Sequence, residues 1–196
     1  MLFLKDKFKN TRIILASKSP RRSILLDQLG IGFETYTECQ TEELYPSGLN
    51  EHQIPVYLAE DKSAACDHLL NEDTLLITAD TIVWCEKRVL DKPAGREEAI
   101  SILEEISGRT HQVITGVCLR SPAKSVSFSS STSVSFRKLR TDEILYYVDN
   151  FEPYDKAGAY GIQEWIGYIG VESINGSYFN VMGLPLDKVY ENLMVF

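Results

Sequence analysis

The sequence predicts an α/β protein, and the order of its apolar and helical segments leads to that fold class. Short apolar runs alternate with segments of helical periodicity through the first two thirds of the 196 residues. The hydrophobic content of 44% is ordinary for a chain of this length that folds around a real core. There is no internal repeat and no clear interdomain linker, so we expect a single domain over residues 1–196.

Five strands are expected from the apolar runs. The last one alternates serine with apolar residues and ends at Phe136. Its composition suggests a low-complexity linker, whereas its period of two indicates a half-buried strand, and we favour the strand. The expected strands are Ile13–Ala16, Phe33–Tyr36, Leu75–Thr78, Val113–Leu119 and the long segment ending at Phe136.

Five helices are expected from apolar stripes and from the residues at their ends. Gly108 is a plausible stop for one of them, and Thr141, followed by two acidic residues, is a plausible start for another. A hairpin turn is expected at Glu86–Arg88. The expected helices are Pro20–Leu29, Pro55–Leu70, Arg96–Ser107, Asp142–Val148 and Leu186–Leu193.

The segment from Ile14 to Leu26 predicts a strand, a serine-rich turn and the start of a helix. Ser19 is the expected N-cap and Pro20 the expected first helical residue. Arg21 and Arg22 then fall in the first helical turn. A cation there is disfavoured by roughly 0.3–1 kcal/mol, because the helix start already carries partial positive charge. An anion such as phosphate would explain both arginines, and a solvated basic turn would explain them equally well.

Two acid–lysine combinations could carry chemistry. Asp80 follows the apolar run that ends near Thr78, where an acid could hold a divalent cation or activate water, or simply cap a surface turn. The hairpin would bring Lys92 back toward the strand of Asp80, where it could reach a phosphate; a solvated lysine is the plainer interpretation. Lys62 interrupts an apolar helical face and could meet Glu42 in a cleft or as a surface ion pair.

Composition excludes several classes of function. The formal net charge of -8 argues against a general nucleic-acid or membrane-surface binder. The four cysteines are scattered without a C-x-x-C pair, so we expect neither a zinc site nor a disulfide framework, and a reducing compartment fits. The first residues do not form a signal peptide, and no apolar run approaches the length of a membrane span.

Several segments together resemble the Maf family of nucleoside triphosphate pyrophosphatases, in family order over nearly the whole chain. Two further loops join the ones above: one offers Gln163, whose amide suits a base edge, and the other leads into the last helix. The matching segments are Leu15–Arg22, Ala59–Lys62, Ala79–Val83, Asp91–Pro93, Ser107–Val117, Asp155–Gln163, Ile174–Tyr178 and Gly183–Pro185.

The resemblance implies a long twisted mixed β-sheet with flanking helices, and two lobes around a cleft, as in inosine triphosphate pyrophosphatases. It implies a single Maf-like domain, hydrolysis of a nucleoside triphosphate to the monophosphate and pyrophosphate, a divalent cation (Mg²⁺ or Mn²⁺) as cofactor, a homodimer and a cytoplasmic location. Nucleic acid and membrane are not expected partners.

The same resemblance implies a role for each matching residue. Asp80 would be the general base and, with Glu42, would engage the metal and the attacking water. Lys62 and Lys92 would neutralise triphosphate charge. The residues implied to bind the phosphates are Ser17, Arg21 and Arg22, and those implied to lie near the base are Thr81 and Gln163.

The segment Ala159–Gln163 and the pair Asp80–Thr81 resemble the branch of the family that prefers dTTP and UTP. The stretch before Glu42 lacks the acids that relatives often carry, and Glu164–Trp165 replaces small residues after the glutamine. The alternative function is a nucleotide-binding regulator of cell division or septum formation that binds without turnover.

Overall fold

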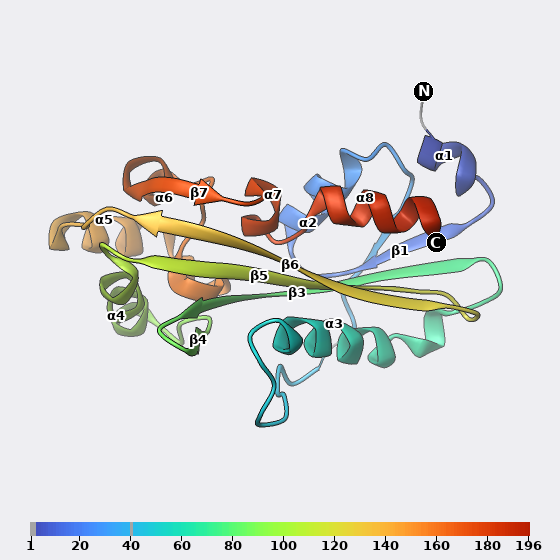
Figure 1. Ribbon diagram of the computed structural model, residues 1–196, viewed down its shortest axis with the longest axis horizontal. Coiled ribbons are helices and arrows are strands. Elements are labelled where there is room, and N and C mark those ends of the chain that lie inside the picture. Colours follow the sequence, from blue (N-terminus) through green and yellow to red (C-terminus); the bar gives the residue numbers. More distant parts are fainter. Residues whose placement is uncertain (1–2, 40) are drawn as a thin grey trace. The chain divides into compact units, whose positions relative to one another are not determined.

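The computed structural model describes residues 3–39 and 41–196 and is built of strands and helices in alternation (Figure 1). The strands are β1 (Arg12–Ala16), β2 (Glu34–Tyr36), β3 (Thr74–Cys85), β4 (Arg88–Leu90), β5 (Thr110–Arg120), β6 (Ser125–Phe136) and β7 (Val171–Asn175). The helices are α1 (Phe3–Lys7), α2 (Pro20–Asp27), α3 (Gln53–Ala65), α4 (Arg96–Ile106), α5 (Thr141–Phe151), α6 (Trp165–Gly170), α7 (Tyr178–Val181) and α8 (Leu186–Val195). Single 3₁₀ turns cover Asp67–Leu69, Pro153–Asp155 and Ala157–Ala159.

The strands form one mixed seven-stranded sheet, in agreement with the predicted fold class. Its order is β2-β1-β3-β5-β6-β7, with β4 paired to β3. β1 is parallel to both β2 and β3, whereas the pairs β3–β4 and β6–β7 are antiparallel. The serine-rich segment is therefore a strand: beyond Ser131 its even-numbered residues are buried, as the period of two predicts.

The chain divides into two compact units. Unit 1 comprises the chain up to Asp80 together with Thr115–Ser130 and Gly183–Phe196, and unit 2 comprises Thr81–Ile114 and Ser131–Met182. The expectation of a single domain over residues 1–196 stays a prediction.

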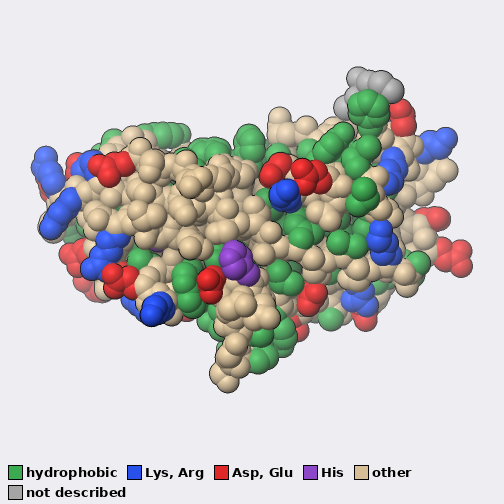
Figure 2. All heavy atoms as spheres, in the orientation of Figure 1, with side chains coloured by type: hydrophobic (Ala, Val, Ile, Leu, Met, Phe, Trp, Pro, Cys, Tyr) green, Lys and Arg blue, Asp and Glu red, His purple; other side chains and the backbone are tan. Residues whose placement is uncertain are grey.

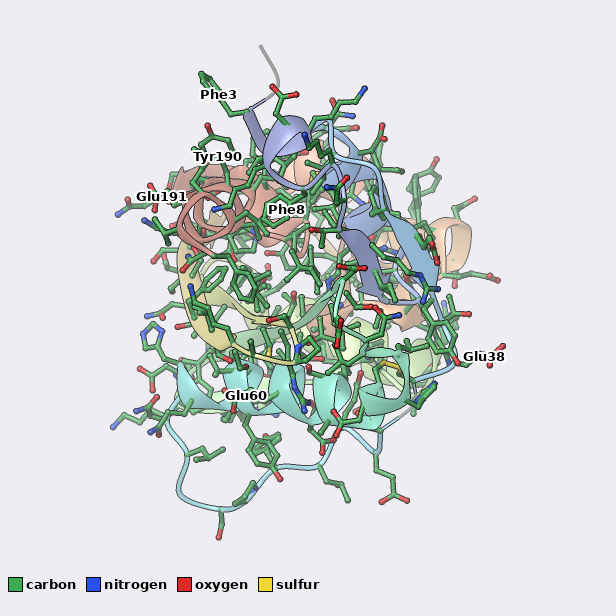
Figure 3. All side chains as sticks on the ribbon, turned by 90° about the vertical axis from the view of Figure 1, so that its right-hand side faces the viewer. Phe3, Phe8, Glu38, Glu60, Tyr190 and Glu191 are labelled. Carbon is green, nitrogen blue, oxygen red and sulfur yellow. A yellow bond between two sulfur atoms is a disulfide. The ribbon has the colours of Figure 1, made fainter. Side chains whose placement is uncertain are left out.

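Unit 1 is layered, with α2 and α8 over one face of its strands and α3 over the other (Figures 1 and 3). The helix α3 lies very close to β5 because Gly116 has no side chain. A Cβ on Gly116 would stand 2.2 Å from the carbonyl carbon of Pro55, near the start of α3. The hydroxyl of Thr78 on β3 also donates to the carbonyl of Ala59 on α3 at 2.6 Å. These contacts fix α3 against the sheet.

Unit 2 is built around an apolar cluster in which α4 packs against α5. The helix α4 buries Ala99, Leu103 and Ile106, as its periodicity predicts. The expected hairpin joins β3 to β4, and Glu86 and Lys87 have φ of 46° and 67°. Two consecutive positive φ values are those of a type I′ turn, whose twist matches that of the paired strands.

Some boundaries differ from the predictions. β3 continues through Asp80 to Cys85, so Asp80 lies within the strand rather than after its end. The polar residues at positions 78–81 suggested an end, but the β-branched and apolar residues after them extend the strand. On α2 the buried residues are Leu25 and Leu26, whereas Ile24 is exposed. The structure also forms α1, α6, α7 and β7, which the periodicity did not predict.

Cys39 and Cys66 form a disulfide, which corrects the expectation that the chain has none (Figure 3). Their Cα atoms lie 5.5 Å apart although 27 positions separate them in the sequence. Sequence spacing could not reveal the pair, because folding of α3 against β1 and β2 brings the two residues together. Cys85 and Cys118 are buried free thiols.

Acidic and basic side chains are mixed over the face of the molecule in Figure 2. Such a distribution is that of an ordinary solvated surface. Within the described part of the chain, no helix has the length and apolar character needed to cross a membrane.

Candidate active site

A lysine held between two carboxylates is the main charged feature of unit 1. The ammonium group of Lys62 donates to Oδ1 of Asp80 and, at 3.0 Å, to Oε1 of Glu43. The side chain of Asp80 is 8% exposed and that of Lys62 17%, whereas that of Glu43 is 45% exposed. Asp80 and Lys62 are thus largely withdrawn from water, whereas the carboxylate of Glu43 is open to it.

The backbone of unit 1 explains why Lys62 reaches Asp80. Ala59, which accepts the hydrogen bond from Thr78, lies three residues before Lys62, so both residues share the face of α3 that meets β3. Asp80 follows Thr78 by two residues, and residues two apart in a strand point to the same face. Lys62 therefore interrupts the apolar face of α3 because it points at a buried carboxylate.

The carboxylate that meets Lys62 is Glu43, which corrects the expected pairing of Lys62 with Glu42. The segment that carries both residues is irregular, so neighbouring side chains leave it in different directions. Glu42 is exposed. An acidic pair at this point was visible in the sequence, but the choice between its two members depends on local backbone geometry that no periodicity encodes.

Arg22 directs its guanidinium group at backbone carbonyls. Its Nε donates to the carbonyl of Gly183 and its Nη1 to the carbonyl of Ala79, both at 2.8 Å. Desolvation lowers the pKa of Arg22, and the negative charge of Asp80 opposes that shift. Arg22 thus ties the start of α2 to β3 directly before Asp80. The neighbouring Arg21 is partly buried at the same helix start.

Ser17 lies directly after β1 and is nearly buried. Its hydroxyl accepts a hydrogen bond from the backbone N–H of Ser19 at 3.1 Å, and its own N–H donates to the carbonyl of Tyr36 at 3.0 Å. Ser19 is the N-cap of α2 by position, as predicted, but its side chain makes no capping hydrogen bond. The turn between β1 and α2 is therefore organised by Ser17.

Three of the predicted site residues belong to unit 2: Thr81, Lys92 and Gln163. Lys92 is exposed and follows β4, in a segment held by a 3.4 Å hydrogen bond from the N–H of Gly158 to the carbonyl of Asp91. Gln163 is half-buried, and its backbone carbonyl accepts a hydrogen bond from the hydroxyl of Tyr168 at 2.5 Å. The glycine-rich run before Gln163 includes Gly158, which has a φ of 71°.

The carboxylates of Asp80 and Glu43 are suitable ligands for a hard divalent cation. Within the described residues, no three His, Cys, Asp or Glu side chains are grouped so that they could hold a metal ion. Mg²⁺ and Mn²⁺ commonly bind through one or two carboxylates, with water and substrate phosphates as the other ligands. The donor set therefore fits a cation that binds together with a phosphorylated substrate.

Two solved structures match this chain at low similarity. The Staphylococcus aureus Ham1 protein is 15% identical, with a TM-score of 0.46 over 64% of this chain and 72% of that chain. A nucleoside-triphosphatase / dITP/XTP pyrophosphatase from Mycobacterium abscessus is 14% identical, with a TM-score of 0.42 over 94% and 96% of the two chains.

Sequence relatives are far more similar. The dTTP/UTP pyrophosphatase of Parabacteroides distasonis is 52% identical over 191 residues, which are 97% of this chain and 99% of the relative. The dTTP/UTP pyrophosphatase of Bacteroides fragilis is 51% identical over 193 residues, or 98% of each chain. The family model described as Maf-like protein matches residues 12–196. These matches span every segment that suggested the resemblance, and the chain therefore belongs to the Maf family.

Proposed function

We propose that this protein hydrolyses dTTP and UTP to the nucleoside monophosphate and pyrophosphate. The observation that carries the proposal is the identity of about half of all residues, over nearly the full length of both chains, to relatives named dTTP/UTP pyrophosphatase. The buried Asp80, held by Lys62, supplies a group of the kind that such a hydrolysis needs.

Asp80 is the proposed general base. Lys62 contacts it through Oδ1, and we assign Oδ2 as the oxygen that accepts a proton from the attacking water. As the water oxygen bonds to phosphorus, the α–β phosphoanhydride bond breaks and pyrophosphate leaves with the bridging oxygen. The reaction needs an aligned water and neutralised charge rather than a covalent intermediate.

Lys62, Lys92 and Arg21 are the proposed cations for the triphosphate. Lys62 also holds Asp80 and Glu43 at fixed positions, so that neither carboxylate has to be ordered when substrate arrives. Ser17 is a further proposed phosphate contact. For Arg22 we propose a positioning role, because two of its donors hold the carbonyls of Ala79 and Gly183.

Asp80 and Glu43 would hold the divalent cation, with Glu42 as an exposed neighbouring acid. A bound Mg²⁺ or Mn²⁺ would neutralise phosphate charge and lower the pKa of a coordinated water. Thr81 and Gln163 are the proposed contacts to the nucleobase, since a side-chain amide both donates and accepts hydrogen bonds. A homodimer and a cytoplasmic location, where nucleoside triphosphates are abundant, complete the proposal.

Ion chromatography of products tests the reaction directly. The protein is incubated with dTTP, UTP, CTP, ATP or GTP and with Mg²⁺ or Mn²⁺. Monophosphate with equimolar pyrophosphate, formed fastest from dTTP and UTP, is the expected result. Diphosphate with phosphate would refute the reaction, and tight binding without products would favour the regulator of cell division, which no observation on this chain otherwise favours.

A further inference from the structure

The backbone around Gln163 is held by contacts that come from three other elements of unit 2. The hydroxyl of Tyr147, on α5, accepts a hydrogen bond from the N–H of Gly161 at 3.0 Å and donates to Oε2 of Glu164. The other carboxylate oxygen of Glu164, Oε1, pairs with the ammonium group of Lys156 at 3.2 Å. The hydroxyl of Tyr168, on α6, donates to the carbonyl of Gln163.

Apart from the contact made by Tyr168, which is exposed, these contacts lie in the interior of unit 2. Tyr147 is fully buried, and the side chains of Lys156 and Glu164 are 10% and 20% exposed. Glu164 can lie this close to the backbone because Gly161 has no side chain: a Cβ there would stand 2.6 Å from the carboxyl carbon of Glu164. Burying a charge pair costs desolvation free energy, and a solvated acid would not carry that cost. The burial of Glu164 with Lys156 therefore calls for an explanation.

None of these hydrogen bonds uses the side-chain amide of Gln163. They fix the chain two residues before it, at its own carbonyl and one residue after it. Recognition through an amide requires the donor and acceptor to be held within about 0.5 Å and 10–20° of the productive geometry. A brace that immobilises the backbone and leaves the amide available meets that requirement.

We propose that Glu164, together with Tyr147 and Lys156, is a positioning residue that fixes Gln163 for recognition of the nucleobase. The inference rests on the proposed function, in which Gln163 contacts the base.

Two variants of the full-length protein test the brace. Tyr147→Phe removes both hydroxyl contacts, and Glu164→Gln removes the charge pair with Lys156 while keeping the shape of the side chain. The ratio of kcat/KM for UTP to kcat/KM for GTP is measured for each. We expect the ratio to fall about tenfold in Tyr147→Phe and about threefold in Glu164→Gln, the size of one lost hydrogen bond or less.

Inhibition by inorganic tripolyphosphate separates positioning of the base from general damage. Its inhibition constant should stay within about twofold of wild type in both variants, because tripolyphosphate carries no base. The matched control is Tyr146→Phe on the same helix, where the side chain is 50% exposed. That control should leave the ratio and the inhibition constant unchanged.

Gln163→Ala makes failure of the inference distinguishable from failure of the proposed function. If Gln163→Ala lowers the UTP/GTP ratio while neither Tyr147→Phe nor Glu164→Gln does, the brace is overturned and base recognition by Gln163 stands. An equal fall of kcat/KM for both nucleotides in the brace variants, or a weakened affinity for tripolyphosphate, also overturns it. If Gln163→Ala itself leaves the ratio unchanged, the proposed base contact fails.

Discussion

Unit 1 and the apolar core of unit 2 bury different kinds of polar group. Unit 1 withdraws charges from water: Asp80 and Lys62 face each other, and Arg22 lies against backbone carbonyls nearby. Unit 2 holds one such pair, Lys156 with Glu164, but its apolar core buries polar groups that stay neutral. His111 shares a 2.7 Å hydrogen bond with the hydroxyl of Tyr160, and the amide of Asn180 donates to the carbonyl of Val113 at 2.9 Å.

This difference separates buried groups that we expect to serve catalysis from buried groups that we expect to serve stability. Burying an ion pair seldom stabilises a fold beyond what apolar residues would achieve, so Lys62 and Asp80 call for a functional explanation. A neutral group costs less to bury than a charge: Nε2 of His111 is satisfied by Tyr160, while its buried Nδ1 has no partner among the described residues. We therefore expect variants of Asp80 and Lys62 to act mainly on catalysis, and variants of the neutral buried groups of unit 2 to act mainly on stability.

The largest expected effect is that of Asp80→Asn on turnover. The amide keeps the shape of the carboxylate but cannot accept the proton of water, so kcat should fall by about 10³-fold or more. Lys62 retains Glu43, and the fold should persist in circular dichroism and urea unfolding. The matched control is Asp73→Asn, an exposed residue directly before β3. Near-normal turnover in Asp80→Asn would rule out this residue as the base.

Arg22 and Arg21 should divide between stability and substrate binding. Arg22→Met leaves the carbonyls of Ala79 and Gly183 without their charged donors and should cost about 4 kcal/mol in urea unfolding. Arg21→Met should raise KM and lower kcat together while the unfolding free energy changes by less than about 1 kcal/mol. The assignment is contradicted if Arg22→Met is as stable as wild type, or if Arg21→Met is the one that unfolds.

The disulfide makes the stability of unit 1 sensitive to reductant. Opening the bond between Cys39 and Cys66, which are 27 positions apart, should cost about 3.5 kcal/mol through the freed entropy of the unfolded chain. Dithiothreitol should therefore lower the urea midpoint of the wild-type protein. The double variant Cys39→Ser/Cys66→Ser should start from the lower midpoint and show no response to reductant. An identical response of both proteins would contradict a stabilising disulfide.

Acid should lower the stability of the protein through the buried His111 of unit 2. Desolvation lowers the pKa of His111 to about 4, below its unfolded value of about 6.5. The unfolded state therefore binds more protons between these values, and stability is lost as pH falls through that window. The expected loss between pH 7.5 and 4.5 is about 2.5 kcal/mol.

Urea unfolding across this pH range checks the expected acid sensitivity. The variant His111→Gln should flatten the pH dependence. Glu143, whose pKa is lowered to about 2 mainly by its hydrogen bond with Arg137, loses its contribution only below about pH 4.5. The two groups are thus separable by pH. A wild-type protein equally stable at pH 7.5 and 4.5 would contradict a neutral His111.

Sequence periodicity predicted most elements of the fold because each depends on its own residues. Alternation identified β6 despite its serine content, and an interrupted apolar stripe singled out Lys62. The roles of the individual site residues stay predictions, with Lys62 and Asp80 brought together and the others distributed over both units. The sequence could not predict which acid pairs with Lys62. Glu42 and Glu43 are chemically alike, and only the path of an irregular segment selects Glu43.

By itself, the sequence determined the α/β class, the hairpin at Glu86 and Lys87, and a set of charged residues that apolar patterning does not explain. Only the tertiary structure decided that Cys39 pairs with Cys66, that Arg22 holds backbone carbonyls, and that Glu164 contacts both Tyr147 and Lys156. The physical reason is range. Periodicity and turn chemistry act between near neighbours in the chain, whereas these contacts form between segments that meet only when the sheet and its helices have packed.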